Sequence, residues 1–270
     1  MSFTLSGIHV YPLKSAAGVE LEAAWVERRG FTHDRRWMVV NVEGSFLTQR
    51  DYPRLALIKV QISDGGGLIL RAPGMPALTI SAPQEGEERC EVRVWEDQVS
   101  AVRISNRSDL WLSRFLETDC RLVFLPDDER RPLTLAYAHP GDHVSFADGF
   151  PFLLISEASL ADLNARLNNP VAMNRFRPNL VVAGCEPYAE DGWQRIRLDN
   201  VVFRVAKPCS RCRITTVDQE TGLTTKEPLR TLQTYRKQEG EIWFGVNLVP
   251  ENTGRVRVGD SVDVVETKSS

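Results

Sequence analysis

The chain has 270 residues, of which 42% are hydrophobic and 26% charged, and its formal net charge is −3. This length accommodates one large domain or two small ones, and the slight acidic excess argues against a general nucleic-acid-binding surface, which needs a basic excess. No apolar run is long enough to span a membrane. The N-terminus lacks signal-peptide and presequence patterns, and five irregularly spaced cysteines do not form a disulfide framework, so we expect a reduced, cytoplasmic protein.

Short alternating strands joined by turn residues dominate the pattern. Four segments are each predicted to form two strands around a two-residue turn. Such dense hairpins are typical of barrels or sandwiches and not of a doubly wound parallel sheet. The segments are 35–50 around Glu43-Gly44, 91–104 around Asp97-Gln98, 195–205 around Asp199-Asn200 and 254–265 around Gly259-Asp260.

Helices are expected to be few. Apolar stripes at helical spacing predict three, which we interpret as core-packing helices without chemistry of their own. Ser108 and Ser156 are expected to cap the first two, in segments 108–117 and 156–170, and Pro228 is expected at the first helical position of the third, in segment 227–236. The sequence therefore predicts a mainly β protein with a few helices (α+β). A polar, proline-containing segment, 126–144, is expected to link two halves or to cover a site.

Two cysteines lie three positions apart in KPCSRCRITT, residues 207–216, among three basic residues. We predict that Pro208 ends a strand, so that Cys209 and Cys212 emerge on a loop. Nearby cations favour the thiolate over the thiol, which indicates a reactive or metal-binding pair. The plainer alternative is two semi-buried cysteines in a β-rich core.

Other uses of the cysteine pair are less well supported. Structural zinc needs four ligands, usually as two close pairs, and only one pair exists here. A thioredoxin-like pair would precede a helix, whereas RITTVD is predicted to continue as a strand. A catalytic Cys–His pair stays open, because the histidine could come from anywhere in the fold. No phosphate-binding P-loop and no G-x-G-x-x-G motif occurs, so nothing indicates ATP or nicotinamide binding.

Several segments together resemble a known family. In chain order they are YPLKS, DRRW, SFADGFPFLLISEASLADLN, FRPNLVV, KPCSRCRITTVDQETG, KEPLRTLQTYR and FGVNLVPENTGRVRVGD. They are similar to MOSC-domain (molybdenum cofactor sulfurase C-terminal) proteins with an N-terminal β-barrel domain, such as bacterial reductases of N-hydroxylated bases and the mitochondrial amidoxime reducing component. The resemblance covers essentially the whole chain. It implies an N-terminal MOSC β-barrel domain over residues 1–120 and a MOSC β-barrel domain over residues 121–270.

The resemblance also implies a molybdenum cofactor, a pterin whose dithiolene holds molybdenum and whose far end carries a phosphate. The metal-ligating cysteine of the family matches Cys212, while Cys209 is expected to be structural. Residues matching the cofactor-binding positions are Lys14, Ser15, Arg35, Arg177, Asn179, Ser210, Arg211, Cys212 and Asn247. Taken alone, Lys14 could be a solvated turn residue, Arg35 and Arg36 a surface pair, and Arg177 the cover of a strand edge.

Asp148 lies in a segment that the family places beside the cofactor, so it is a candidate catalytic residue, as proton donor or substrate contact. Its plainer reading is a loop-capping residue. Arg36 is a second candidate substrate contact. The chain departs from the animal relatives at Asn247, where they hold tyrosine, and at Gly149 and Phe150, which replace polar residues, so only backbone contacts would be shared at the last two.

These features predict a molybdenum-cofactor reductase of N-hydroxylated compounds, such as hydroxylamino-purines, amidoximes or hydroxamic acids. Some bacterial members carry a cysteine-rich iron–sulfur domain that is absent here, so we expect electrons from a separate protein of flavin reductase, ferredoxin-like or cytochrome type. The alternative is a persulfide carrier, or a carrier or store of the molybdenum cofactor. Pyridoxal phosphate is kept as a second candidate cofactor.

Overall fold

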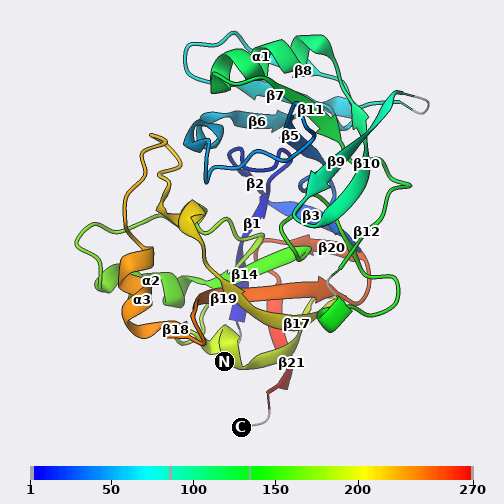
Figure 1. Cartoon of the computed structure of the whole chain (residues 1–270). Helices are drawn as coiled ribbons and strands as arrows, with labels where there is room; N and C mark the ends of the chain where they lie inside the picture. Colours follow the sequence, from blue (N-terminus) through cyan, green and yellow to red (C-terminus); the bar gives the residue numbers. More distant parts are fainter. Residues whose placement is uncertain (1–2, 85–86, 134, 269–270) are drawn as a thin grey trace.

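The computed structural model describes residues 3–84, 87–133 and 135–268. Strands make up most of the regular structure and form two stacked β-rich bodies, with α-helices on the outside of each (Figure 1). The mainly β class with a few helices, predicted from the hairpin pattern, is therefore confirmed.

The lower body in Figure 1 is a closed barrel of seven strands. Closure comes from β14, which pairs parallel with β15 on one side and antiparallel with β19 on the other. The strands, in order around the barrel, are β14 (Phe152–Ser156), β15 (Leu180–Ala183), β1 (Phe3–Val10), β21 (Ser261–Thr267), β16 (Trp193–Leu198), β17 (Val201–Ser210) and β19 (Glu241–Pro250). Two short strands extend it, β2 (Val19–Leu21) beside β1 and β18 (Lys237–Gln238) beside β19. Buried aliphatic side chains and the rings of Phe31, Phe152 and Phe203 form its core.

The upper body holds two antiparallel sheets and α1 (Asn106–Leu116) (Figure 1). One sheet has the order β5 (Trp37–Asn41), β11 (Cys120–Phe124), β10 (Asp97–Arg103) and β9 (Arg89–Val94); the other is β6 (Lys59–Ile62), β7 (Leu68–Arg71) and β8 (Leu78–Ile80). A second core lies between the two sheets and α1, with Trp37, Trp111 and Phe115 among its largest members.

The two bodies are interleaved along the chain. Although β1 belongs to the predicted N-terminal domain, it lies between β15 and β21 in the barrel. Another small sheet joins β3 (Ala23–Glu27) and β4 (Gly30–Phe31) to β20 (Gly254–Arg257). The segment after residue 120 forms β11 and then a short hairpin of β12 (Arg131–Pro132) and β13 (His143–Val144). Residues 1–120 and 121–270 therefore share sheets, because strand pairing depends on position in space and not on order in the chain.

The helix predictions are right in place but not always in their first residue. Ser156 caps α2 (Glu157–Ala165) by accepting a hydrogen bond from the Ser159 N–H, as predicted. Ser108 was expected to cap α1, but Ser105 does so, and Ser108 lies inside the helix. Pro228 immediately precedes α3 (Leu229–Tyr235). The sequence offers two serines three residues apart at α1, and the earlier one is the cap because its hydroxyl accepts a hydrogen bond from the Ser108 N–H.

The hairpin predictions are correct around Asp199-Asn200, where β16 pairs with β17. The turn between β9 and β10 lies at Trp95-Glu96, two residues earlier than predicted, and Asp97 already pairs with Val94. After β5, only isolated bridges replace the expected second strand. The C-terminal prediction is wrong as a hairpin: β20 pairs with β3, and β21 pairs with β1 and β16. Alternating valines predict that a segment forms a strand, but they do not determine which other strand it pairs with.

A buried carboxyl beneath α2 predicts a pH-dependent stability. Glu190 is fully buried and accepts hydrogen bonds from the Ser156 N–H and the Ser159 hydroxyl, and burial raises its pKa. The folded state therefore keeps this proton at pH values where the unfolded state has lost it. As a result, the free energy of unfolding falls as pH rises from the ordinary pKa of a glutamate toward the raised pKa of Glu190. We expect Glu190→Gln to remove this dependence in urea unfolding at several pH values.

The control for this measurement is Glu157→Gln at the exposed start of α2. A difference in stability between wild type and Glu190→Gln that does not change with pH would contradict the prediction.

Candidate functional site

A cavity of about 350 Å³ lies where the two bodies meet. Residues from both parts of the chain line it, including Trp95 from the β9–β10 turn and Asn247 from β19. All the predicted cofactor-binding and catalytic residues are among them: Lys14, Ser15, Arg35, Asp148, Arg177, Asn179, Ser210, Arg211, Cys212 and Asn247. The structure thus brings together residues up to 233 positions apart in the sequence, from Lys14 to Asn247.

The cysteine loop differs from its prediction in two ways. Strand β17 does not end before Pro208 but continues to Ser210, because beyond Arg204 it pairs with β19 alone and a proline is tolerated at such an edge. The segment after Cys212 is not a strand: residues 213–216 form a 3₁₀ turn. The hydroxyls of Thr215 and Thr216 donate to the carbonyls of Cys212 and Arg213, which competes with strand pairing.

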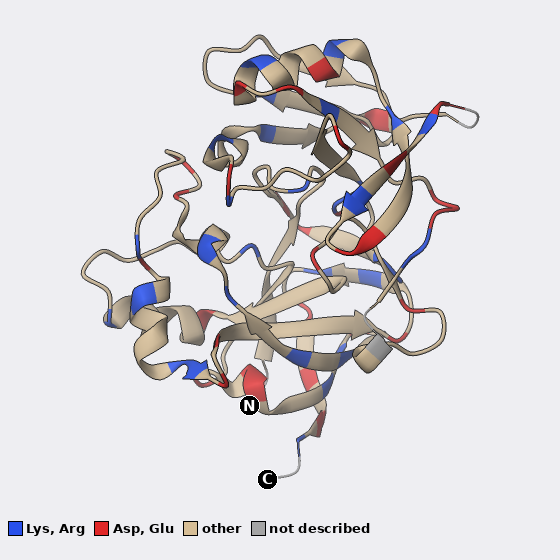
Figure 2. Ribbon diagram, in the orientation of Figure 1, with Lys and Arg blue, Asp and Glu red and all other residues tan. Residues whose placement is uncertain are grey.

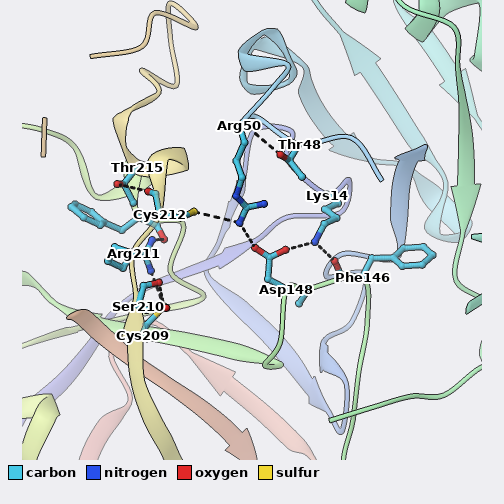
Figure 3. Close-up of polar contacts among 12 residues, drawn as sticks. Lys14, Thr48, Arg50, Phe146, Asp148, Cys209, Ser210, Arg211, Cys212 and Thr215 are labelled. Carbon is cyan, nitrogen blue, oxygen red and sulfur yellow. Dashed lines mark hydrogen bonds and ion pairs between the residues drawn. The ribbon is translucent and has the colours of Figure 1, made fainter. Parts of the chain in front are cut away.

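Each thiol of the pair contacts an arginine. Arg211 donates to the Cys209 sulfur at 3.0 Å, and Arg50 donates to the Cys212 sulfur at 3.3 Å (Figure 3). Both cysteines are half-buried and both line the cavity. Cys209 also packs against a hydrophobic cluster that includes Phe176 and Phe244, as the alternative of semi-buried core cysteines expects, so the role of the pair stays a prediction.

Asp148 stands at the junction of two cations. Lys14 donates to one of its carboxylate oxygens at 2.5 Å and Arg50 to the other at 3.1 Å (Figure 3). Removal from bulk water opposes ionisation of this carboxyl, but Lys14 and Arg50 outweigh it and hold its pKa well below the ordinary value. Asp148 is therefore an anion in this structure. The reading of Lys14 as a solvated turn residue is wrong, because Lys14 is only 5% exposed.

A buried arginine holds the backbone on either side of Asp148. Arg131, 4% exposed, donates to the carbonyls of Ser145, Ala147 and Asp148, and its Nε donates to Asp97 at 2.6 Å. This one side chain thus fixes three nearby carbonyls of the Asp148 segment. The polar segment 126–144, expected to be a linker or a cover, supplies this support through β12.

Positive charge is concentrated in the cavity. Six lining residues are basic and one is acidic: Lys14, Arg35, Arg50, Arg177, Lys207 and Arg211 against Asp148. Over the chain as a whole, by contrast, acidic and basic residues are interspersed on both bodies (Figure 2), and the net charge is −3. Among the described residues, neither Arg177, Lys207 nor Arg211 forms an ion pair with a carboxylate. The cavity therefore suits an anionic ligand.

Arginine orientation supports the same conclusion. Arg177 donates to the Ala16 carbonyl and stacks on Tyr11, and Arg35 stacks on the same ring and donates to Asn179. The Nε of Arg211 is buried and has no hydrogen-bond partner among the described residues. A buried unpaired donor is costly, so a ligand acceptor at this point would satisfy it.

Three of the candidate cofactor-binding residues have unfavourable backbone conformations. Ser15, Arg35 and Arg177 all have left-handed backbones, with φ of 68°, 51° and 56°. This conformation is unfavourable for residues other than glycine and persists where the surrounding structure imposes it, commonly at ligand sites. The three side chains reach the cavity from turns that the local sequence alone would not favour.

Some residues lie elsewhere than predicted, and others were missed. Arg36 does not line the cavity; its guanidinium is buried against the Leu125 carbonyl and Asp127. Arg50 and Trp95 line the cavity, although nothing in the sequence singled them out. Arg50 lies in a polar turn between unremarkable segments, so only its contacts in the folded chain reveal it.

Anion affinity at this site should depend on pH through Lys14. Burial lowers the pKa of Lys14 to about 8, although Asp148 opposes the shift. Its ammonium is therefore lost as pH rises through about 8, and affinity for sulfate, whose charge stays constant in this range, should fall. Losing one charged hydrogen bond of about 1.5–3 kcal/mol corresponds to roughly a 10–100-fold change.

Calorimetric titration of cofactor-free protein with sulfate between pH 7 and pH 9 measures this. Lys14→Arg should retain affinity at pH 9, where the wild type weakens. Equal pH profiles for the two proteins would argue against the role of Lys14.

Comparison with known proteins gives the family. The MOSC N-terminal beta barrel domain matches residues 2–119 and the MOSC domain matches residues 141–263. Human mitochondrial amidoxime-reducing component 1 is 38% identical over 96% of this chain and 82% of its own. The chain belongs to the MOSC-domain proteins with an N-terminal MOSC β-barrel domain.

Two further similarities concern a longer plant protein and a solved bacterial structure. The molybdenum cofactor sulfurase of Solanum lycopersicum is 31% identical over 96% of this MOSC-domain chain but only 35% of its own length. The crystal structure of the YUAD protein from Bacillus subtilis aligns over 97% of this chain and 94% of that chain, with 11% identity and a TM-score of 0.42. No helix within the described residues is long and apolar enough to cross a membrane.

Proposed function

We propose that this protein is a molybdenum-cofactor-dependent reductase that converts N-hydroxylated compounds to the corresponding amine-level products. Relatives named amidoxime-reducing components, aligned over nearly the whole chain, support this reaction. The observation that carries the proposal is a cavity lined by six cations and the Cys212 thiol, in a chain of net negative charge.

The residues present fit the cofactor. Arg177 and Arg211, cations without carboxylate partners among the described residues, together with the buried Nε of Arg211, match a phosphate-bearing ligand rich in hydrogen-bond acceptors. Within residues 3–84, 87–133 and 135–268, no three His, Cys, Asp or Glu residues gather as a metal site. A metal at Cys212 would thus take its remaining ligands from a bound group, as a dithiolene provides.

The bound cofactor would supply the two electrons that cleave the N–O bond: R–NH–OH + 2e⁻ + 2H⁺ → R–NH₂ + H₂O. The protein contributes a thiolate ligand from Cys212 and a fixed negative charge from Asp148. Lys14 holds a proton beside Asp148 at neutral pH, and the proton demand of the reaction makes this pair the best candidate for proton delivery. The electrons would come from a separate donor protein of flavin, ferredoxin-like or cytochrome type.

The test is elemental analysis of protein made in a host that synthesises the molybdenum cofactor, followed by turnover of an amidoxime with a chemically reduced viologen as electron source. Bound molybdenum and amidine formation are the expected results. Bound molybdenum without turnover of amidoximes, hydroxylamino-purines or hydroxamic acids would favour a cofactor carrier or store. A persulfide on Cys209 or Cys212 in the native mass spectrum, without molybdenum, would favour a sulfur carrier.

Two further expectations belong to this proposal. We expect a cytoplasmic protein, which fractionation of the native host tests. Pyridoxal phosphate remains the second candidate cofactor, with Lys14 and Lys207 as the lysines that line the cavity. Borohydride reduction would fix such an adduct to one of them, and mass spectrometry would detect it.

A further inference from the structure

Arg50 contacts both candidate catalytic residues at once. One nitrogen of its guanidinium, Nη2, lies 3.3 Å from the Cys212 sulfur and 3.1 Å from an Asp148 carboxylate oxygen (Figure 3). Its two hydrogens suffice for these two bonds. Cys212 and Asp148 come from separate segments of the MOSC domain, while Arg50 comes from the N-terminal domain.

The position of Arg50 is itself fixed by aromatic packing. Its guanidinium lies 4.9 Å from the centre of the Trp95 ring, and Trp95 packs edge-to-face on Phe46 at 5.0 Å. The Lys14 ammonium lies over the ring of Phe46, 5.1 Å from its centre. Lys14 and Arg50 then both bind Asp148, so the five side chains form a closed ring of contacts.

Trp95 has an unfavourable backbone conformation and an exposed side chain in this arrangement. It is 44% exposed and has a left-handed backbone, with φ of 57°, at the turn between β9 and β10. Neither feature helps a hairpin, because a bulky side chain is unfavourable in this conformation and large apolar side chains are normally buried. Contact with Arg50 and Phe46 gives the indole a partner at the cavity wall.

We propose that Arg50 is a positioning residue that fixes the Cys212 sulfur and the Asp148 carboxylate relative to one another, and that Trp95 holds Arg50 in place. The effect of Arg50 on catalysis rests on the proposed function. Its two hydrogen bonds to Cys212 and Asp148, called the bridge below, do not depend on that function. A planar guanidinium suits this task better than an ammonium, because its donors point in fixed directions. Partners that orient a metal ligand typically matter by about 10–100-fold in metal affinity or activity.

The first test uses cofactor-free protein. Hydrogen bonding slows rotation and exchange of guanidinium hydrogens, so arginine side-chain NMR should show a protected Arg50 signal in the wild type. Asp148→Ala should abolish that protection, and Cys212→Ala and Trp95→Leu should weaken it. A freely rotating Arg50 in the wild type, or protection unchanged in all three variants, overturns the bridge whether or not the protein binds molybdenum.

The second test compares Arg50→Met and Arg50→Lys in cofactor-loaded protein. We expect Arg50→Met to keep its molybdenum, to lose about 10–100-fold in kcat with little change in KM, and to alter the Mo(V) electron paramagnetic resonance spectrum. Arg50→Lys should restore part of the rate. Unchanged kcat and spectrum would overturn the positioning role, and so would loss of molybdenum, which would make Arg50 a cofactor-binding residue.

The matched control is Arg54→Met. Arg54 also stacks on an aromatic ring, that of Phe115 at 4.7 Å, and also pairs with a carboxylate, that of Glu117, but it does not line the cavity. Equal losses in Arg50→Met and Arg54→Met would indicate a general effect on the N-terminal domain and overturn the specific role of Arg50.

Discussion

Replacing Cys212 by serine is expected to lower the rate of N-hydroxyl reduction by about 100-fold or more. Removing a residue that only orients a metal ligand typically costs about 10–100-fold, and loss of the ligand itself should cost at least as much. Serine keeps the size of the side chain but offers a hard, protonated oxygen in place of a soft thiolate. Cys212 is half-buried and ends in the cavity, so the fold should tolerate the change. Turnover per bound molybdenum, with unfolding measured in parallel, separates chemistry from stability.

Cys209 provides the matched control for this prediction. It lies three residues away, lines the same cavity and also accepts a hydrogen bond from an arginine. Cys209→Ser should lose much less activity than Cys212→Ser. The reverse order would move the ligand role to Cys209, and equal activity in wild type and Cys212→Ser would refute thiolate ligation.

Replacing Arg131 by methionine is expected to lower the free energy of unfolding by about 3–5 kcal/mol, because three carbonyl acceptors lose their donor. Each carbonyl that stays buried without a donor costs about 1–3 kcal/mol. Methionine keeps most of the buried volume but has no donor. The Asp148 segment would lose its support, so activity should fall together with stability. Denaturant unfolding of the cofactor-free protein measures the free energy of unfolding.

Arg131→Lys serves if the methionine variant does not fold, since an ammonium can bind some of the three carbonyls and should give a smaller loss. Arg121→Met, on the exposed face of β11, is the control and should change stability by no more than about 0.5 kcal/mol. A loss below about 1 kcal/mol for Arg131→Met would show that water replaces the arginine at these carbonyls.

The candidate site could be predicted largely through the resemblance of whole motifs. Physical reasoning on the residues alone reached only the basic cysteine loop, and it left metal, nucleophile and core cysteine open. Arg177 and Lys14 each had an equally plain surface interpretation, because burial cannot be read from a short polar motif. Their roles toward a cofactor remain predictions, although the structure places them around one cavity.

Arg50, Trp95 and Arg131 show what motifs could not supply. Arg50 contacts Cys212 and Asp148, Trp95 packs on Arg50, and Arg131 donates to the Asp148 carbonyl. None of the three belongs to the segments that carry the family resemblance. Arg36 shows the opposite error, because it was predicted to contact substrate and does not line the cavity. It is adjacent to Arg35 in the sequence, but their side chains diverge, one to the cavity and the other to the Leu125 carbonyl.

Local sequence patterns were enough to predict the strand-rich class, most strand positions and the α2 cap, because alternation and capping depend on neighbours within a few residues. Which strands pair could be seen only in the folded chain: β20 pairs with β3 and not with β21, and β1 lies in the barrel between β15 and β21. The site depends on those pairings: closing the barrel and stacking the upper body on it brings Arg50, Asp148 and Cys212 within hydrogen-bonding distance. Long-range contacts of this kind leave no periodic signal in the chain.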